Sequence, residues 1–444
     1  MASTYVTYTA GNLPTMTKFT FSIWTKRSQL GANQRMLEAR VNGTNLSTMY
    51  MQSDDKFAVY QEAGGVTKCD IKTDMKLRDV SGWYHICVAV DTTLASIDDR
   101  VKIYINGVDE GYTGTGQVQN EEHNYCRSNC ATVLGTDDNG SGTQFYSGSM
   151  GFAIICVGTA YAATDFGEFD SNGVWTIKTS PSVTYGTDGF FILKNGNSVT
   201  DQSGEGNDFT VGAGNLTNNE DSPSNVFATM NPLDNYFQGS TFSNGNNTVV
   251  SGSSSETYNT STLMMNSGKF YCEMKYVSGS NQMFGIISLD KKNDTKNIGY
   301  VGDSNCGTQA VGLAKGGDYY INGSDTTYTG GSNTSWTTGD IISIAMDRTN
   351  SKVYFGKNGT WMGSGDPTSG STGTGAISFS PDTGSSWGFA TSVYASTSAT
   401  NFGNGYFQTT AISSAGTNAS NNGVFEYDVP TGYTALCTKG LNGE

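Results

Sequence analysis

The sequence predicts an all-β protein with two antiparallel β-sandwich (jelly-roll) domains in tandem and very little helix. Glycine is abundant, with 57 residues, proline is rare, with 7, and aromatic residues make up 11% of the 444 residues. This composition is typical of short strands joined by many turns. Apolar residues recur at every second position in many short segments, which is the period of a strand. A period of 3.6 residues with helix caps is not found.

The first half of the chain carries one series of strand signals. Its clearest segments are 19–24, 56–60, 83–90 and 101–105. In the last of these the alternation is strict, so Val101, Ile103 and Ile105 share one face of the predicted strand. Asn106-Gly107 follows at once and indicates a tight hairpin turn, because both residue types accept a positive φ.

The second half carries a separate series of strand signals. Its clearest segments are 269–276, 283–289, 340–347 and 352–355. The stretch between the two series is rich in Asn, Asp, Gly and Ser, which favours a connector. We therefore expect a first domain at residues 1–200, a connector at 201–235 and a second domain at 236–444.

The charge of the chain limits its partners. The net charge is −15 and the isoelectric point is about 4.5, so a nucleic-acid partner is not expected, since phosphate recognition needs basic patches. We find no run of the roughly 18 apolar residues that a membrane span needs, and no membrane insertion is expected. The N-terminus lacks the basic and apolar regions of a secretory signal peptide. The expectation is a protein made in a cytoplasm and not exported by that route.

Cysteine and histidine give no clear metal site. Eight cysteines in 444 residues are far fewer than a disulfide scaffold has. Cys126 and Cys130 are either free thiols or a loop disulfide, and their spacing from His123 matches no common zinc pattern. His85 lies inside a predicted core strand, where a structural role is favoured over a catalytic one. We expect no metal ion and no cofactor.

Five segments of the first half follow one another in a recognisable order: Phe21–Arg27, Trp83–Asp91, Asp99–Val108, Val133–Gly135 and Phe145–Gly151. On these residues the first half resembles laminin-G-like, concanavalin A-like domains. The second half has its own set of segments: Ser267–Glu273, Gly285–Leu289, Ile298–Tyr300, Gly339–Asp347, Val353–Trp361 and Thr400–Gly403. On these residues the second half resembles SPRY-type sandwiches.

The order of the two halves is similar to that of a recurrent group of tailed-phage virion or tail proteins. Joining phrases at 185–190, 201–208, 221–233 and 429–437 extend the resemblance over nearly the whole chain. The resemblance implies a non-enzymatic virion surface protein, such as a fibre, spike or decoration, that recognises a host-surface glycan or protein. Other virion proteins are its implied partners, and a homo-oligomer in the particle is expected. A purely structural capsid or tail assembly protein is the alternative.

Sandwich loops are the expected place for binding. Asp137, Asp138 and Asn139 follow a strand and could hold a sugar or Ca²⁺, although no specific calcium motif supports the ion, and a solvated turn explains them as well. The other candidates in loops or turns are Asp303, Tyr319, Tyr320 and Trp361. For Trp361 a packing role is the competing interpretation.

A glycoside hydrolase is the less favoured third function. Such enzymes on concanavalin-type folds commonly display E-x-D-x-x-E on one strand, which aims all the acids into one cleft. The nearest match is Glu168-Phe-Asp170, which lacks the third acid. We therefore expect no enzymatic activity and no catalytic residues.

Overall fold

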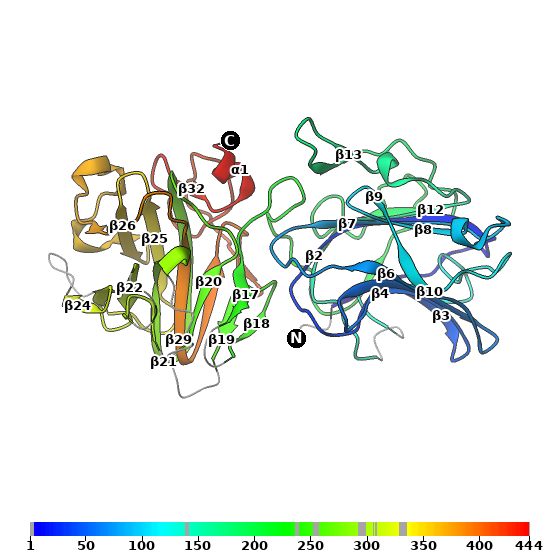
Figure 1. Ribbon diagram of the computed structural model, residues 1–444, viewed down its shortest axis with the longest axis horizontal. Coiled ribbons are helices and arrows are strands. Elements are labelled where there is room, and N and C mark those ends of the chain that lie inside the picture. The colour runs from blue at the N-terminus through cyan, green and yellow to red at the C-terminus, as the bar shows by residue number, and fades with distance from the viewer. Residues whose placement is uncertain are drawn as a thin grey trace. The chain divides into compact units, whose positions relative to one another are not determined.

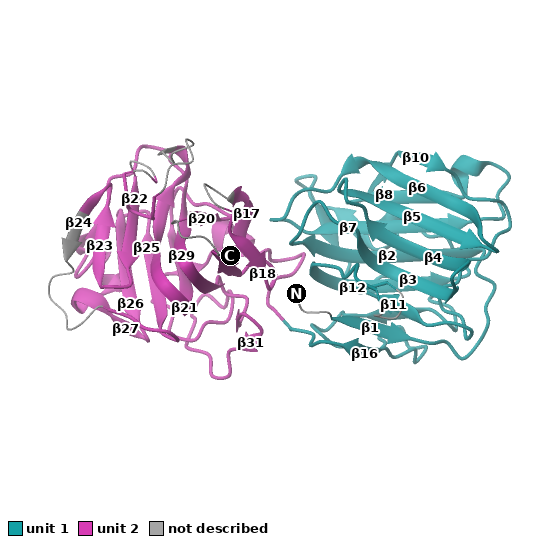
Figure 2. Cartoon of the chain, turned by 90° about the horizontal axis from the view of Figure 1, so that it is seen from below, with its two compact units in different colours: residues 1–218 teal, residues 219–444 magenta. Residues whose placement is uncertain are grey.

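The structure is a computed structural model that describes residues 4–137, 142–235, 239–251, 257–291, 299–304, 306, 309–327 and 335–443. Strands make up 46% of the residues and helices 5%, so the prediction of an all-β protein with very little helix is confirmed. The chain divides into two compact units, Met1–Asn218 and Asn219–Glu444 (Figure 2).

Unit 1 is a sandwich of two antiparallel sheets (Figure 1). The strands of sheet A, in spatial order, are β10 (Tyr112–Thr115), β6 (Val66–Lys76), β5 (Lys56–Ala63), β4 (Asn45–Met51), β3 (Gln34–Asn42), β11 (Thr132–Leu134), β1 (Tyr5–Tyr8) and β16 (Thr210–Ala213). Those of sheet B are β15 (Phe190–Ile192), β12 (Gly148–Val157), β2 (Lys18–Arg27), β7 (Tyr84–Asp91), β8 (Val101–Ile105) and β9 (Val108–Glu110).

The predicted alternation in 101–105 becomes β8. Val101, Ile103 and Ile105 are buried, and the residues between them are half-buried. The turn after β8 places Asn106 and Gly107 at φ 49° and 82°. A Cβ on Gly107 would lie 2.3 Å from the indole ring of Trp175, so this turn requires glycine for space as well as for conformation.

A second layer covers the outer face of sheet B. The hairpin β13 (Gly167–Phe169) and β14 (Trp175–Ile177) belongs to it, and β13 is seen above sheet B in Figure 1. Its Trp175 joins Trp24, Phe166 and Phe191 in an apolar cluster separate from the core between the sheets. Part of the outer face of sheet B is therefore covered by apolar side chains.

Unit 2 is organised by two long strands, β21 (Lys269–Ser288) and β29 (Trp387–Asn401), which pair with each other along most of their lengths. The first part of β21 pairs with β25 and its last part with β22. The remaining strands are β17 (Met230–Asn235), β18 (Thr241–Ser243), β19 (Thr248–Val250), β20 (Thr257–Ser261), β22 (Ala310–Ala314), β23 (Asp318–Ile321), β24 (Ser324–Thr327), β25 (Ile341–Asp347), β26 (Lys352–Lys357), β27 (Thr360–Trp361), β28 (Ile377–Ser378), β30 (Tyr406–Phe407), β31 (Thr410–Ala411) and β32 (Thr434–Ala435).

Within the residues that the structure describes, helical structure consists of short 3-10 segments and one short α-helix. These are η1 (Ile97–Asp99), η3 (Ala163–Asp165), η4 (Leu289–Lys291), η5 (Met362–Ser364), η6 (Pro367–Thr372) and α1 (Thr438–Asn442). Within the described residues, no helix is long and apolar enough to cross a membrane.

Residues 201–235, expected to form a connector, are divided between the two units. β16 pairs with β1 in sheet A, and the side chain of Phe209 is buried in the core of unit 1. β17 pairs with β20 in unit 2. The polar, glycine-rich composition that favoured a connector here belongs to turns that lead directly into edge strands.

Candidate binding face

The outer face of sheet A carries charged and aromatic side chains where sheet B carries an apolar cover. Figure 2 looks onto the molecule from the side of sheet A. Strand alternation places one set of side chains in the core and the other set on this face. In β3 to β5 the register aligns Arg35 with Tyr50, and Glu38 with Thr48 and then Tyr60. These residues come from neighbouring strands, so their positions are fixed by the ladder.

An Arg–Glu–Arg bracket occupies β3. Arg40 Nε donates to Glu38 Oε1 at 3.2 Å, and Arg35 Nε lies 3.6 Å from Glu38 Oε2. The Glu38 side chain is only 1% exposed although it belongs to the outer face. Two guanidinium groups therefore cover one carboxylate, and the carboxylate orients them.

Two tyrosines lie beside the bracket. The guanidinium carbon of Arg35 is 4.0 Å from the centre of the Tyr50 ring, a cation–π contact. Tyr60 donates its hydroxyl hydrogen to Glu62 Oε2 at 2.8 Å. Partial burial, together with the neighbouring Glu62 carboxylate, raises the pKa of Tyr60. Both rings are half-buried, so part of each stays accessible on the face.

A series of hydrogen-bonded polar side chains lies next to Tyr50 on this face. Lys72 Nζ donates to Asp54 Oδ2 at 2.8 Å and to Gln52 Oε1 at 3.4 Å. Gln52 Nε2 in turn donates to the Tyr50 hydroxyl at 2.9 Å. The hydrogen bond to Asp54 raises the pKa of Lys72. Fixed donors, fixed acceptors and aromatic rings are thus combined on one open surface.

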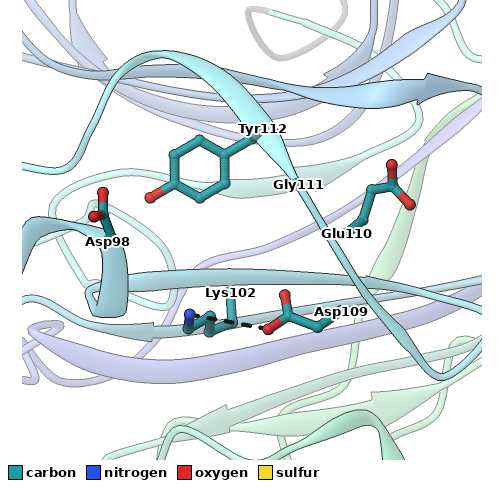
Figure 3. Close-up of a pocket in the computed structure, with 6 residues that line it drawn as sticks. All are labelled: Asp98, Lys102, Asp109, Glu110, Gly111 and Tyr112. Carbon is teal, nitrogen blue, oxygen red and sulfur yellow. Dashed lines mark ion pairs between the residues drawn. The ribbon is translucent and has the colours of Figure 1, made fainter.

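A separate hollow of about 400 Å³ lies where the edge strands β9 and β10 meet η1 (Figure 3). Asp98, Asp109 and Glu110 contribute carboxylates, and Lys102 Nζ is 3.9 Å from Asp109 Oδ2. Burial, with the nearby acids, raises the pKa of Tyr112, whose ring also lines the hollow. The hollow is acidic, shallow and poor in aromatic surface, so we regard it as secondary to the face of sheet A.

Asp137, the first residue predicted from sequence to bind a ligand, has a structural role in its own loop. Asp137 is 9% exposed, and its Oδ1 accepts a hydrogen bond from the backbone N–H of Gln144 at 3.1 Å. Its carboxylate therefore closes the loop. Asp138 and Asn139 lie outside the described residues.

The predicted residues of unit 2 are only partly brought together. Tyr320 packs edge-on against Tyr300, with ring centres 5.0 Å apart, and Asp303 lies in the turn that follows Tyr300. Tyr319, on the same strand as Tyr320, packs against the apolar core. Trp361 packs against an apolar cluster, with its ring centre 6.4 Å from that of Tyr271, which is the packing role weighed for it.

The acids considered for hydrolysis lie on the exposed β13–β14 hairpin. The Glu168 side chain is 65% exposed and 3.8 Å from Lys178 Nζ. Asp170 Oδ1 accepts the backbone N–H groups of Asn172 and Val174, both at 2.8 Å, and so closes the hairpin turn. Cys126 and Cys130 are buried free thiols. In the described part of the chain, no three His, Cys, Asp or Glu side chains form a group that could hold a metal ion.

Sequence reasoning missed the bracket because β3 is irregular. Its register shifts between Arg35 and Leu37, so Arg35 and Glu38 share a face although they are an odd number of residues apart. The available signal was a pair of tyrosines in two successive strand-like segments. Tyr50 and Tyr60 each lie among polar and apolar residues at period two, in segments 45–51 and 56–63.

Comparison with known proteins gives a match between one family and part of the chain. The family described as the concanavalin A-like lectin/glucanases superfamily (Laminin_G_3) matches residues 1–153. No curated protein matches the sequence.

Solved structures of several β-sandwich domains are also similar to parts of the chain. The SPRY domain of human HERC1 has 18% identity and a TM-score of 0.29, over 38% of this chain and 96% of its own. The heptameric SAP-like pentraxin of Limulus polyphemus has 14% identity and a TM-score of 0.29, over 48% of this chain and 91% of its own. Because these scores are low, they carry no further argument. The chain is thus similar, over residues 1–153, to the concanavalin A-like lectins and glucanases.

Proposed function

We propose that this chain is a non-enzymatic glycan-binding protein that uses the outer face of sheet A in unit 1. The observation that carries the proposal is the Arg35–Glu38–Arg40 bracket with Tyr50 and Tyr60 beside it. The similarity of residues 1–153 to concanavalin A-like lectins and glucanases supports a carbohydrate ligand.

The chemistry of the face suits a sugar. A sugar ring presents C–H groups on its flat side and hydroxyl groups at its edge. Aromatic rings pack against the former, and charged groups make stronger hydrogen bonds to the latter than neutral groups do. The bracket holds its guanidinium groups in place before a ligand arrives, which lowers the entropy lost on binding.

A binding role is favoured over hydrolysis because the acids suggested for catalysis serve the hairpin turn. Asp170 Oδ1 accepts hydrogen bonds from two backbone N–H groups, and Glu168 is mostly exposed on the same hairpin. General acid catalysis requires a carboxyl group whose pKa is raised by its surroundings, and exposure to water opposes that. We therefore expect no polysaccharide turnover, with or without the substitution Glu168→Gln.

We further propose that the chain belongs to the surface of a phage particle. The support is the resemblance of its two halves, in their order and joining phrases, to tailed-phage proteins. Many copies on a particle would convert weak single contacts into firm attachment. Mass spectrometry of purified particles should find the chain in several copies, and its absence from intact particles would remove this part of the proposal.

Glycan-array binding by the full chain tests the main proposal. We expect a dissociation constant between about 1 μM and 1 mM for one site, weakened about tenfold by Tyr60→Ala because one of the two aromatic rings on the face is lost. Phe169→Ala is the matched control, since Phe169 is an aromatic side chain 51% exposed on the hairpin, away from sheet A. If no glycan binds even when the chain is displayed in many copies, a purely structural assembly role is favoured.

A further inference from the structure

Arg35 uses few of its hydrogen-bond donors. Its Nη1 donates one long hydrogen bond, of 3.4 Å, to Thr48 Oγ1. Its Nε is inaccessible to solvent and has no hydrogen-bond partner in the described structure. The ion pair with Glu38 at 3.6 Å is too long for a hydrogen bond. A guanidinium has five N–H donors in a planar fork, so most of them are unused.

Arg100, also in unit 1, is an arginine whose guanidinium makes several hydrogen bonds and serves for comparison with Arg35. Arg100 donates three hydrogen bonds to backbone carbonyls, of Leu94 at 2.7 Å, Ala95 at 2.7 Å and Gln117 at 2.9 Å. That arginine holds a loop. Arg35 is also largely buried, with only 16% of its side chain exposed, yet it holds no loop. Burying a charge with few hydrogen bonds is costly, and a ligand that supplies acceptors to the exposed part of the guanidinium would lower that cost.

The charge of the bracket suggests which acceptors these are. Two guanidinium groups contact one carboxylate in β3, so a ligand would meet cationic donors there. Glu38 is too deeply buried to bind a ligand itself. Farther along the sheet, Glu62 on β5 and Asp70 on β6 carry carboxylates that repel a densely charged polyanion but accept hydrogen bonds from hydroxyl groups. An anion of low charge density with adjacent hydroxyl groups fits this pattern.

We infer that the ligand of this face is an acidic sugar, a glycan that carries a carboxylate on its ring, and that Arg35 binds the carboxylate. The inference rests on the proposed glycan-binding function and names its ligand class. The planar fork of an arginine matches a carboxylate with two parallel hydrogen bonds. The distant negative charges of the chain are screened beyond about 8 Å at physiological salt, so they do not prevent this short contact.

Matched pairs of ligands isolate the carboxylate. The full chain is titrated with oligosaccharides of galacturonate, glucuronate and mannuronate, each beside its own methyl ester, which removes the charge and keeps the hydroxyl groups. We expect at least one acid to bind about tenfold more tightly than its ester, as for the loss of one bidentate ion pair. The affinity of the acid should also fall as salt is raised, whereas that of a neutral glycan should not.

Variants assign the preference to Arg35. Arg35→Gln should reduce the acid-to-ester ratio to about one, while Arg35→Lys should keep part of it because the charge remains without the fork. Arg78→Gln is the control, since Arg78 is 59% exposed and pairs with Asp55 instead. Thermal melting checks that each variant is folded.

The outcomes separate the inference from the proposed function. Equal binding of acids and esters overturns the acidic-sugar inference and leaves glycan binding in place. Binding of neutral glycans alone does the same. If no acid, ester or neutral glycan binds, both the inference and the proposed function are overturned.

Discussion

The two units bury titratable groups of opposite kinds. Both histidines of the chain, His85 and His123, lie in unit 1 and are fully buried. Unit 2 has no histidine but fully buries the carboxyl group of Glu273. Acid should therefore weaken one unit and strengthen the other, which makes pH a way to observe each core separately.

His85 is held in its neutral form by its neighbours. The indole N–H of Trp175 donates to Nδ1 at 3.1 Å, so the proton of the ring is assigned to Nε2, which donates to Ser22 Oγ at 2.9 Å. The ring stacks between Trp24 and Trp175. Burial lowers the pKa of His85 to about 3. It also lowers the pKa of His123, whose Nε2 lies 3.2 Å from Gln117 Oε1, to about 3.

Glu273 connects the C-terminal segment of unit 2 to β21. Its carboxyl oxygens accept the backbone N–H groups of Glu426 at 2.9 Å and Tyr427 at 2.8 Å. Tyr271 and Asn401 also donate to it, at 3.1 Å and 3.2 Å. Burial raises the pKa of Glu273 to about 7, against the opposing effect of these four donors. The folded unit therefore retains this proton to a higher pH than the unfolded chain does.

The largest expected effect is the loss of unit 1 stability in acid. A histidine with a lowered pKa stays neutral when folded and gains a proton when unfolded, so stability is full above pH 6.5 and falls as the pH is lowered. At about pH 5 each histidine should cost about 2 kcal/mol, and the two together about 4 kcal/mol. Calorimetry of the full chain should show the unit 1 transition moving to lower temperature.

The histidines can be separated from the carboxylates of unit 1 by substitution. His123→Gln should remove about half of the pH dependence, because Gln carries no titrating group and its amide can still reach Gln117. A transition of unit 1 that keeps the same pH dependence in this variant would show that His123 is charged or accessible when folded.

How much of this follows from sequence depends on the residue. His85 lies in a strand with alternating apolar neighbours, so its structural role could be predicted. Its partner Trp175 is 90 residues away on a hairpin that no local pattern connects to β7. The fold class follows from alternation, which is local, and was confirmed. The candidate binding face depends on a β-bulge at Arg35 and on three strands in register, and period counting along the sequence does not contain this tertiary information.

The next largest effect on stability is expected when the fragment of unit 1 is shortened at its C-terminal end. A fragment of residues 1–218 should fold alone, and a fragment of residues 1–200 should be less stable, because it loses β16 and the side chain of Phe209. Phe209 is 3% exposed. Its ring stacks on that of Tyr8, with ring centres 5.3 Å apart, and packs edge-on against that of Phe190, with ring centres 4.6 Å apart. Losing one such buried ring costs about 3 kcal/mol or more.

Urea unfolding of the two fragments measures this difference. Residues 219–444 serve as the companion fragment and should keep the acid response of unit 2. Equal stability of the fragments 1–200 and 1–218 would contradict the assignment of residues 201–218 to unit 1 and would favour a connector there.

The smallest expected effect is the gain of unit 2 stability in acid. Since the pKa of Glu273 is raised when folded, its contribution to stability is full below the unfolded value of about 4.5 and is lost as the pH rises through about 7. From about pH 7.5 to pH 5 unit 2 should gain about 2 kcal/mol, in the direction opposite to unit 1. Glu273→Gln should abolish the gain, whatever its effect on stability at one pH, because the amide that replaces the carboxyl group does not titrate. Glu220→Gln, at an exposed position of the same unit, should leave the slope unchanged. A slope of the wild-type sign in Glu273→Gln would show that another group of unit 2 carries the proton, and the contrast between the two cores would then not rest on this carboxyl group.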